Sequence, residues 1–292
     1  MTSHERACDG IYRPNAQGIW TPPIPPDHRD EEYDSASFKI LRAMQNQHFW
    51  YLGRHRFILR ELRRMGKLLP GELGSRSAID LGGGTGGWVA YARQNLPDLF
   101  AEWALADSSL QGLELAEQVV GENVRRYQID LLKLGWNERW DAAFMLDVLE
   151  HIPQDADALA QVRDSLRPGG LLFVTTPAFP FFWSYNDDLA SHQRRYRRRD
   201  FQKLADGAGL ELCDSRYFMF LLSPLYYLAR LKKIDVKNMS PEEIKELVAR
   251  THGLPSKPVN AALRAIFSAE TPLGHYLRFP WGTSILGVFR KK

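Results

Sequence analysis

The glycine-rich stretch Asp80–Gly87 constrains the fold of this chain more than any other feature. It follows the apolar residues Ala78 and Ile79 and precedes a helix-like segment that starts at Trp88, so the sequence predicts a strand, a tight turn and a helix. Glycine reaches positive φ at little cost, and the start of a helix offers unpaired N–H groups. We therefore expect the turn to hold a nucleotide-like ligand directly against the backbone.

Two motifs overlap in this turn. Gly82, Gly84 and Gly87 match the dinucleotide pattern G-x-G-x-x-G. An acidic-x-G-x-G-x-G pattern is matched instead by Asp80, Gly82, Gly84 and Gly86. The turn alone leaves both a dinucleotide and a smaller group open, so the rest of the chain has to decide.

Short apolar runs alternate with helical patterns after Ser77, which predicts a doubly wound α/β fold with a mostly parallel, seven-stranded sheet covered on both faces. The expected strands are Ala78–Leu81, Glu102–Ala106, Val124–Ile129, Ala142–Leu146, Leu171–Thr175, Glu211–Tyr217 and Thr283–Phe289. The expected helices between them cover 86–95, 110–120, 155–166 and 200–208.

The rest of the chain divides around this core. Residues 1–30 contain a proline-rich run at 22–26 and little periodicity, which predicts an extended arm rather than a packed element. Residues 31–76 repeat apolar side chains at helical spacing and are expected to form an N-terminal helical cap. The core would then comprise 77–217 and 282–292, with a helical insertion at 218–281.

Composition excludes several classes of protein. With 44% hydrophobic residues the chain can bury a sizeable core, and its formal net charge of +3 is too small to imply a nucleic-acid partner. Cys8 and Cys213 lie far apart without metal-ligand spacing, so we expect neither a disulfide nor a metal site. The polar segment Met1–Gly10 is unlike a signal peptide and no apolar run reaches ~18 residues, which favours a cytoplasmic protein.

Ligands of an open parallel sheet bind beyond the carboxyl ends of its strands. Asp107 ends the second predicted strand, where a carboxylate could accept hydrogen bonds from both hydroxyls of a ribose; an N-cap of the next helix is the alternative. Asp130 ends the third strand beside Ile129 and Leu131, where it could bind the exocyclic amine of adenine; a loop cap is the alternative. Both positions are therefore candidate cofactor contacts.

Two more motifs complete an ordered set: the fourth predicted strand runs into Asp147–Pro153, and Pro168–Gly170 precedes the fifth. With them the chain, over residues 77–217, resembles the class I S-adenosylmethionine-dependent methyltransferases. The resemblance implies that S-adenosylmethionine is the cofactor, and Gly83 departs from it because many members carry cysteine, alanine or serine there. The implied cofactor contacts are Asp80, Gly82, Gly84, Gly86, Asp107, Ser108, Asp130, Leu131 and Asp147.

Methyl transfer displaces an already activated sulfonium, so such an enzyme mainly has to align the nucleophile, the methyl group and the sulfur. A base is needed only where the acceptor must lose a proton early. Two histidines are candidates: His151, after the fourth strand, and His192, whose ring Asp187 or Asp188 could orient. In the family that this chain resembles, the position of His151 more often shapes the pocket, and His192 could also be a structural loop residue.

Two further blocks resemble a narrower bacterial subgroup of small-molecule methyltransferases. In His48–Arg56 the aromatic side chains could close over the cofactor while Arg54 or Arg56 pairs with its carboxylate; helix packing is the alternative. The block Trp183–Tyr196 follows the fifth strand and is the candidate acceptor site. The expected acceptor contacts are Trp183, Asp188, Arg194, Arg195, Tyr196 and, from the insertion, Tyr226.

Two charged or apolar segments bear on the acceptor. The arginines at 194, 195 and 197–199 would place five guanidiniums together, which fits an anionic acceptor or a membrane surface; a solvated, basic start of a helix is the alternative that we favour. The insertion begins with apolar and aromatic residues, 218–228, and then turns basic. We favour a lid bent at Pro224, with an interfacial helix, a packing helix and a dimer face as alternatives.

Together these features predict a cytoplasmic biosynthetic enzyme that methylates a small-molecule or lipid-linked acceptor, by preference on oxygen. N- or C-methylation on the same fold is one alternative. A nicotinamide-dependent oxidoreductase and a non-catalytic protein that docks to a membrane or partner are alternatives from other classes. A homodimer and peripheral membrane contact also stay open, and no nucleic-acid partner is expected.

Overall fold

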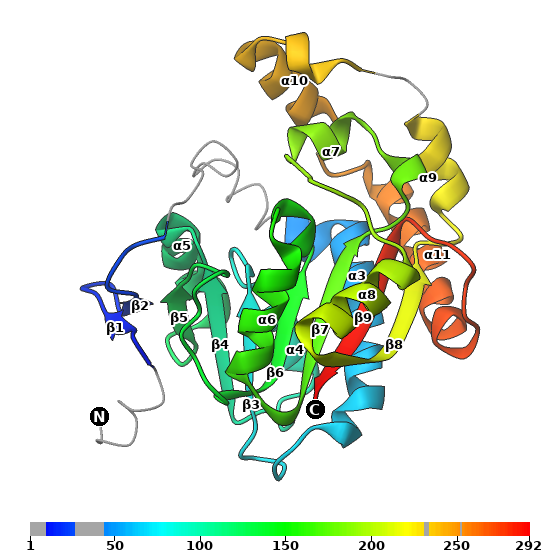
Figure 1. The fold of residues 1–292 in the computed structure, drawn as a ribbon. Coiled ribbons are helices and arrows are strands. Elements are labelled where there is room, and N and C mark those ends of the chain that lie inside the picture. The colour runs from blue at the N-terminus through cyan, green and yellow to red at the C-terminus, as the bar shows by residue number, and fades with distance from the viewer. Residues whose placement is uncertain (1–9, 27–43, 231–233, 252) are drawn as a thin grey trace.

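The computed structural model describes residues 10–26, 44–230, 234–251 and 253–292. A nine-stranded sheet runs through its middle, with helices on both faces (Figure 1). Its strands are β1 (Arg13–Pro14), β2 (Ile19–Thr21), β3 (Ser77–Leu81), β4 (Glu102–Asp107), β5 (Arg125–Gln128), β6 (Trp140–Leu146), β7 (Leu166–Pro177), β8 (Leu210–Phe218) and β9 (Ser284–Lys291). Its α-helices are α3 (Phe49–Met65), α4 (Gly87–Asn95), α5 (Leu110–Val120), α6 (Asp155–Ser165), α7 (Tyr185–Leu189), α8 (Arg198–Ala208), α9 (Ser223–Ala229), α10 (Pro241–Thr251) and α11 (Lys257–Tyr276).

The strand order confirms the doubly wound, mostly parallel sheet. The strands follow one another as β1-β2-β5-β4-β3-β6-β7-β9-β8. Pairing is parallel from β2 through β7, whereas β9 runs antiparallel to both β7 and β8. Chain order therefore reverses between β3 and β6, and a ligand crevice is expected at the carboxyl ends of those two strands.

The prediction of seven strands missed β1 and β2, and the expectation of an unpacked arm is wrong for residues 12–21, which hold both strands. β2 pairs in parallel with the edge strand β5, and Ile19 is fully buried. The buried Tyr12 donates a hydrogen bond from its hydroxyl to the carbonyl oxygen of Leu134, at 2.9 Å. Strands of two and three residues are too short to show a period of two, so the sequence pattern could not reveal them.

Each face of the sheet carries its own core, because successive side chains of a strand point to opposite faces. On β3, Ala78 belongs to the core that packs against α3, α4, α5 and α11. Its neighbour Ile79 belongs to the core that packs against α6 and α8. Figure 1 shows α6 and α8 in front of the sheet and α3 behind it. Both faces are thus apolar, as a mostly parallel sheet requires.

The 218–281 insertion is helical, and its long helix α11 packs along α3 of the N-terminal cap. A Cβ placed on Gly53 would lie 2.0 Å from Cδ1 of Phe267, so glycine is what lets the two helices approach. Pro224 lies in the first turn of α9 and starts that helix, which corrects the expectation that it bends the insertion. Over the described ranges, no helix combines the length and apolarity that crossing a membrane demands.

A buried charge network joins the cap, the sheet and the insertion. On β8, Arg216 donates from Nε to Oδ2 of Asp214 at 2.9 Å and from Nη1 to the carbonyl oxygens of Gly274 and His275, at 3.1 and 2.9 Å. Arg64 of α3 pairs with both Glu61 and Asp214. Burial lowers the pKa of His275 to about 4, so this histidine is neutral at physiological pH. The network fixes the position of α3, which supplies part of the site described next.

Candidate active site

A cavity of about 480 Å³ opens at the carboxyl ends of β3, β4 and β6, where the strand order reverses. All but one of the predicted cofactor contacts line it, although they come from segments far apart in the sequence. These lining residues are Arg54, Asp80, Gly82, Gly84, Asp107, Ser108, Asp130, Leu131 and Asp147. Their meeting at one cavity follows from the topology, because parallel strands end at the same edge of the sheet.

The backbone of the glycine turn follows the acidic-x-G-x-G-x-G pattern. Gly82, Gly84 and Gly86 have φ of +75°, +56° and +79°, whereas Gly87 is the first residue of α4 and is not among the glycines of positive φ. Gly86 does not line the cavity, which corrects its assignment as a cofactor contact. A Cβ placed there would lie 2.3 Å from Cγ1 of Val120, so this glycine packs beneath the turn, against α5.

Asp80 lies under the same turn and explains the glycine at position 83. A Cβ on Gly83 would lie 2.4 Å from Oδ2 of Asp80 and 2.4 Å from Cδ1 of Leu105, so a larger residue would have to displace one of them. Burial raises the pKa of Asp80 to about 7; the guanidinium of Arg54 opposes this shift and the charge of Asp107 adds to it. The Oδ1 atom of Asp80 is buried without a hydrogen-bond partner.

Asp107 connects the turn to the next strand end. Its Oδ2 accepts a hydrogen bond from the N–H of Gly84 at 2.8 Å, and its Oδ1 accepts one from Ser109 at 3.0 Å. The N-cap of α5 is Ser109, whose hydroxyl accepts from the N–H of Gly112, so the alternative role considered for Asp107 belongs to its neighbour. These two hydrogen bonds orient the carboxylate of Asp107 at the wall of the cavity, which this residue lines.

Asp130 caps its loop and also lines the cavity. Its Oδ1 accepts from the N–H of Leu132 at 2.9 Å, which caps the loop after β5. The same residue lines the cavity together with Ile129 and Leu131. A loop cap and a ligand contact are therefore compatible at this position.

The roof of the cavity comes from α3. Arg54 forms an ion pair with Asp147, and its guanidinium lies 4.9 Å from the ring centre of Trp50 and 5.4 Å from that of Tyr51. Asp147 has a φ of +59°, an unusual conformation for a residue with a Cβ. Arg56 points elsewhere and donates to the carbonyl oxygen of Arg264, at 3.5 Å. Of the two arginines that the sequence proposed for a carboxylate, the structure brings Arg54 to the cavity.

Gln45 and Trp88 also line the cavity, and sequence reasoning assigned no role to either. Gln45 is buried, and its Oε1 accepts a hydrogen bond from the hydroxyl of Thr85 at 2.9 Å. A Cβ on Gly87 would lie 2.3 Å from that same oxygen, so Gln45 covers the start of α4. A single glutamine far from the turn carries no spacing signal that could have revealed this contact.

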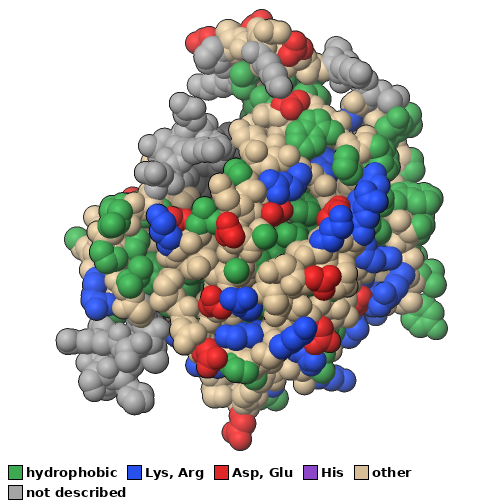
Figure 2. Space-filling model, in the orientation of Figure 1, with side chains coloured by type: hydrophobic (Ala, Val, Ile, Leu, Met, Phe, Trp, Pro, Cys, Tyr) green, Lys and Arg blue, Asp and Glu red, His purple; other side chains and the backbone are tan. Residues whose placement is uncertain are grey.

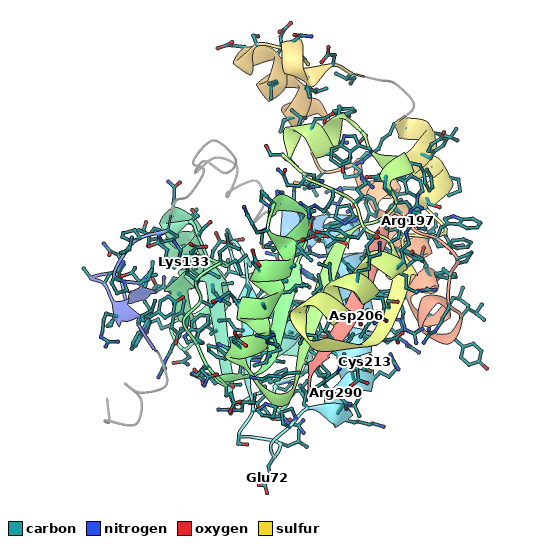
Figure 3. The ribbon with its side chains drawn as sticks, in the orientation of Figure 1. Glu72, Lys133, Arg197, Asp206, Cys213 and Arg290 are labelled. Atoms are coloured by element: carbon teal, nitrogen blue, oxygen red, sulfur yellow. The ribbon has the colours of Figure 1, made fainter. Side chains whose placement is uncertain are left out.

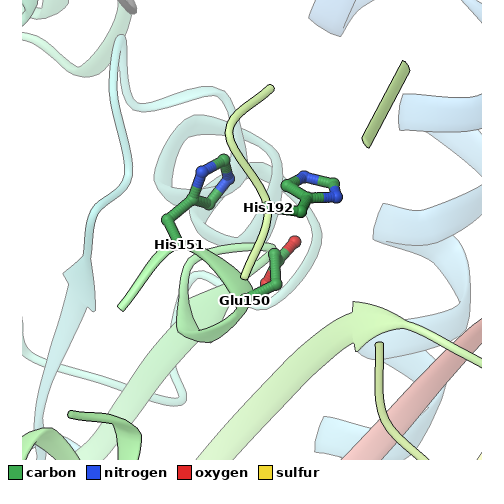
Figure 4. Close-up of side chains that lie close together, drawn as sticks. All are labelled: Glu150, His151 and His192. Carbon is green, nitrogen blue, oxygen red and sulfur yellow. The ribbon is translucent and has the colours of Figure 1, made fainter. Parts of the chain in front are cut away.

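His151 and His192 meet beside the cavity (Figure 4). Their ring centres lie 4.7 Å apart, with the rings nearly perpendicular, and His151 is the one that lines the cavity. Nδ1 of His192 lies 2.9 Å from Oδ1 of Asp187, the arrangement expected of a carboxylate that orients the ring. Both histidines are brought together as candidate bases, and Asp187 rather than Asp188 is the carboxylate beside His192.

Glu150 is a further functional candidate to which the sequence alone assigned no role. It is 0% exposed, and both of its carboxylate oxygens are buried without a hydrogen-bond partner. Burial raises its pKa well above the usual range. One feature of the sequence could have identified Glu150: it directly precedes His151 in the motif that follows the fourth predicted strand.

Arg195 and Tyr196 are wrong as acceptor contacts, because both are buried and bonded within the protein. Arg195 donates from Nε and Nη2 to the two carboxylate oxygens of Asp187, at 2.7 and 2.9 Å, and these side chains are 2% and 1% exposed. Burial alone would raise the pKa of Asp187, but hydrogen bonds from His192 and Arg195 hold it below its usual range. The Tyr196 hydroxyl donates to Oδ2 of Asp155 at 2.9 Å.

The five arginines that the sequence predicted to act together have separate partners in the structure. Arg194 pairs with Asp155 at 2.7 Å, Arg197 lies over the ring of Phe179, and Arg199 lies 3.8 Å from Asp200. The chain enters α8 at Arg198, and a helix turns successive side chains by about 100°. Basic side chains do gather over the α8 side of the molecule, where Arg197 lies (Figures 2 and 3), but they face different partners.

The remaining acceptor candidates line a second cavity, of about 380 Å³. Trp183, Asp188 and Tyr226 contribute to it together with four further aromatic side chains and Arg230. The indole N–H of Trp183 donates to Oδ1 of Asp188 at 3.2 Å. Asp187 accepts from the N–H of Ser184, which lines this second cavity, and also holds His192, which contacts His151 in the first. The buried Asp187–Arg195 pair therefore links the walls of the two cavities.

Comparison with known proteins identifies related sequences and folds. The family model described as a methyltransferase domain matches residues 49–215. The trans-aconitate 2-methyltransferase of Deinococcus radiodurans is 33% identical over 131 residues, a match that covers 45% of this chain and 46% of the relative, so about half of that protein is spanned.

Solved structures share the fold at low identity. A phosphoethanolamine N-methyltransferase 2 of Haemonchus contortus, in complex with phosphomonomethylethanolamine and S-adenosylhomocysteine, superposes with a TM-score of 0.57 at 16% identity over 94% of this chain and 61% of that one. The geranyl diphosphate C-methyltransferase of Streptomyces coelicolor, in complex with Mg²⁺, geranyl diphosphate and S-adenosylhomocysteine, gives 0.50 at 13% over 80% and 77%.

Proposed function

Because this chain belongs to the class I S-adenosylmethionine-dependent methyltransferases, we propose that it methylates an oxygen atom of a small-molecule or lipid-linked acceptor. Membership of the family decides two of the alternatives left open by the sequence. The protein is an enzyme rather than a docking module, and its cofactor is a sulfonium rather than a dinucleotide. The identity of the acceptor is the part that has to be argued from the site.

The residues around the cavity fit S-adenosylmethionine. Gly82 and Gly84 leave backbone open to the cavity, Asp107 suits the ribose hydroxyls, and Asp130 suits the adenine amine. The unpartnered Oδ1 of Asp80 suits the positively charged amino group of the cofactor. When bound, S-adenosylmethionine supplies a methyl group on a positively charged sulfur that is already a good leaving group. The protein's own task is then to hold and orient the acceptor.

The hydrogen bond between Asp187 and His192 is the observation that carries the preference for oxygen. It places the imidazole proton on Nδ1 and leaves Nε2 of His192 as a base, next to the His151 ring that lines the cavity. A hydroxyl acceptor has a proton that a base can remove as the new bond forms. An oriented, base-competent histidine beside the cavity therefore supports O-methylation over C-methylation.

The second cavity supports an acceptor with an apolar part. Phe181, Phe182 and Tyr227 line it, and Arg230 adds a positive charge. On the neighbouring α9, Leu225 and Leu228 are 56% and 62% exposed, which suits contact with a lipid chain or a membrane surface. The trans-aconitate named for the Deinococcus relative is a carboxylate, which supports a small anionic acceptor as the competing class.

Product analysis with labelled cofactor tests the proposal. The enzyme is incubated with S-adenosylmethionine carrying a ¹³C methyl group and with hydroxyl, carboxylate, amine and polyprenyl-linked acceptors, and the products are examined by NMR. We expect the label on oxygen. Label found only on nitrogen or carbon would overturn the choice of acceptor atom.

The role of His192 has a separate test. His192→Ala should lower kcat at least about 100-fold, since a positioned base contributes about 10²–10⁴-fold, while the affinity for S-adenosylhomocysteine stays the same. Full activity of this variant would show that His192 is a structural loop residue.

A further inference from the structure

We propose that Glu150, His151 and His192 form a binding site for one divalent transition-metal ion at the wall of the cofactor cavity. One ligand atom from each side chain lies within 4.8 Å of the others. Glu150 and His151 come from the 3₁₀ turn η2 (Leu149–His151) after β6, and His192 from the loop after α7. Figure 4 shows the three side chains around a shared space.

The burial of the Glu150 carboxylate supports a cation site. The residue is fully buried, and neither carboxylate oxygen has a hydrogen-bond partner. A buried carboxylate of this kind is costly unless it is paired, protonated or bound to a metal. The side chains facing it in the cluster are imidazoles, which bind a metal in the neutral form. A shared ion would give the Glu150 carboxylate a positive partner and would use one nitrogen of each ring.

Asp187 prepares His192 as a ligand. With Nδ1 held at 2.9 Å from Oδ1 of Asp187, the ring keeps its proton on that side and presents the lone pair of Nε2. Asp187 is itself fixed by Arg195 and by the N–H of Ser184, so the orientation of the ring is determined by buried contacts. A carboxylate behind a histidine is the usual support of a metal-binding imidazole.

The set of donors selects the class of ion. Two imidazole nitrogens and one carboxylate suit Zn²⁺, Mn²⁺, Fe²⁺ or Co²⁺ better than Mg²⁺ or Ca²⁺, which prefer oxygen ligands. Three protein ligands leave coordination positions open, and His151 places the site at the cavity wall. An oxygen of the acceptor could occupy such a position, and the ion would then lower the pKa of a bound hydroxyl.

This inference changes the role of His192 in the proposed function. With the ion bound, His192 is a ligand, and the ion instead of the imidazole promotes loss of the hydroxyl proton. It also replaces the expectation, drawn from the spacing of the cysteines, that the chain holds no metal. The binding site itself does not depend on which atom of the acceptor is methylated.

Metal titration of the full chain tests the site directly. Protein treated with a chelator is titrated with Co²⁺, followed by visible absorption, and with Zn²⁺, followed by calorimetry. We expect one equivalent to bind, and we expect Glu150→Gln and His192→Asn each to weaken Zn²⁺ affinity at least about 100-fold, the upper end of the loss caused by removing a supporting residue. Glu72→Gln is the matched control, since Glu72 is exposed at the far end of the molecule (Figure 3). This variant should bind Zn²⁺ with the affinity of the wild type.

Two outcomes would overturn the proposal: no spectral change in wild-type protein with Co²⁺, or Glu150 and His192 variants that bind like the wild type. Thermal unfolding and affinity for S-adenosylhomocysteine show whether each variant is folded. If a variant fails to fold, X-ray absorption of the Zn²⁺-loaded wild type decides, because a shell without imidazole nitrogen excludes the site. None of these measurements involves methyl transfer, so their failure is distinct from failure of the proposed function.

Discussion

The two sides of the cavity are built by different kinds of interaction. On the cofactor side, backbone atoms set the geometry: the N–H groups of Gly82 and Gly83 both donate to the carbonyl oxygen of Ala106, at 2.7 and 3.1 Å. On the acceptor side, buried charged side chains set it, with Asp187 holding both Arg195 and His192. The first side depends on glycines at fixed spacing and the second on partners from separate positions. Changes on the two sides should therefore have different consequences.

The largest expected effect comes from breaking the buried ion pair on the acceptor side. Arg195→Met leaves the carboxylate of Asp187 buried without its main counter-charge, which should lower the free energy of unfolding by about 3–5 kcal/mol. Urea denaturation measures this loss. The folded fraction should bind S-adenosylhomocysteine as the wild type does, because Arg195 does not line the cofactor cavity.

Arg199→Met is the matched control for this change. Its side chain is 71% exposed and pairs loosely with Asp200, so its loss should cost no more than about 0.5 kcal/mol. An Arg195→Met protein that keeps its stability but loses affinity for the acceptor would contradict the structural role. That result would support the prediction from the sequence that Arg195 contacts the acceptor.

The next effect lies on the cofactor side. Asp107→Ala removes the predicted ribose ligand and the acceptor that holds the N–H of Gly84, so affinity for S-adenosylhomocysteine should fall about 100-fold. Calorimetry measures the dissociation constant. Asp107→Asn keeps one oxygen acceptor and should show a smaller loss. An unchanged constant for Asp107→Ala would refute its assignment as a cofactor ligand.

This contrast explains how much of the molecule the sequence could predict. Alternation of strands and helices located the central strands, and the position of a residue at a strand end was enough to bring Asp80, Asp107 and Asp130 to one cavity. Such a position is a local property of the chain. It depends on the topology of the sheet and not on which side chains pair with each other.

Side-chain partners on the acceptor side could not be predicted in the same way. Arg194 and Arg195 are adjacent and equally basic, yet one pairs with Asp155 at the start of α6 and the other is buried against Asp187. Nothing in the sequence around these two arginines distinguishes them. Their different partners follow from the packing of the loop after β7. Glu150 was missed for the same reason, because its burial depends on loops that come together from distant segments.

A third, smaller effect tests whether burial raises the pKa of Asp80 in the folded protein. Its folded pKa of about 7 lies above its usual value, so below pH 4 it is protonated whether folded or unfolded. As the pH rises to about 7, the unfolded chain releases a proton that the folded chain retains, and wild-type stability falls. Asp80→Asn lacks this effect. Its unfolding free energy relative to the wild type should therefore rise by about 1.4 kcal/mol for each unit between pH 5 and 7.

Urea denaturation at pH 5, 6, 7 and 8 measures this difference, which should level off above pH 7. Parallel curves for the two proteins would mean that Asp80 is ionised in the folded state throughout. Arg54 would then neutralise its charge completely, and both sides of the cavity would be stabilised by ion pairs.

The smallest effect concerns the second cavity and tests whether this cavity belongs to the acceptor side. Trp183→Phe removes the exposed indole hydrogen bond to Asp188 but keeps an aromatic ring, so stability should change by less than about 0.5 kcal/mol. The dissociation constant of S-adenosylhomocysteine should not change, since Trp183 is absent from the first cavity. The KM for a lipid-linked acceptor should rise a few-fold. If it does not, the second cavity lies outside the acceptor site, and His151, with its neighbours Glu150 and His192, is left as the surface against which the acceptor is held.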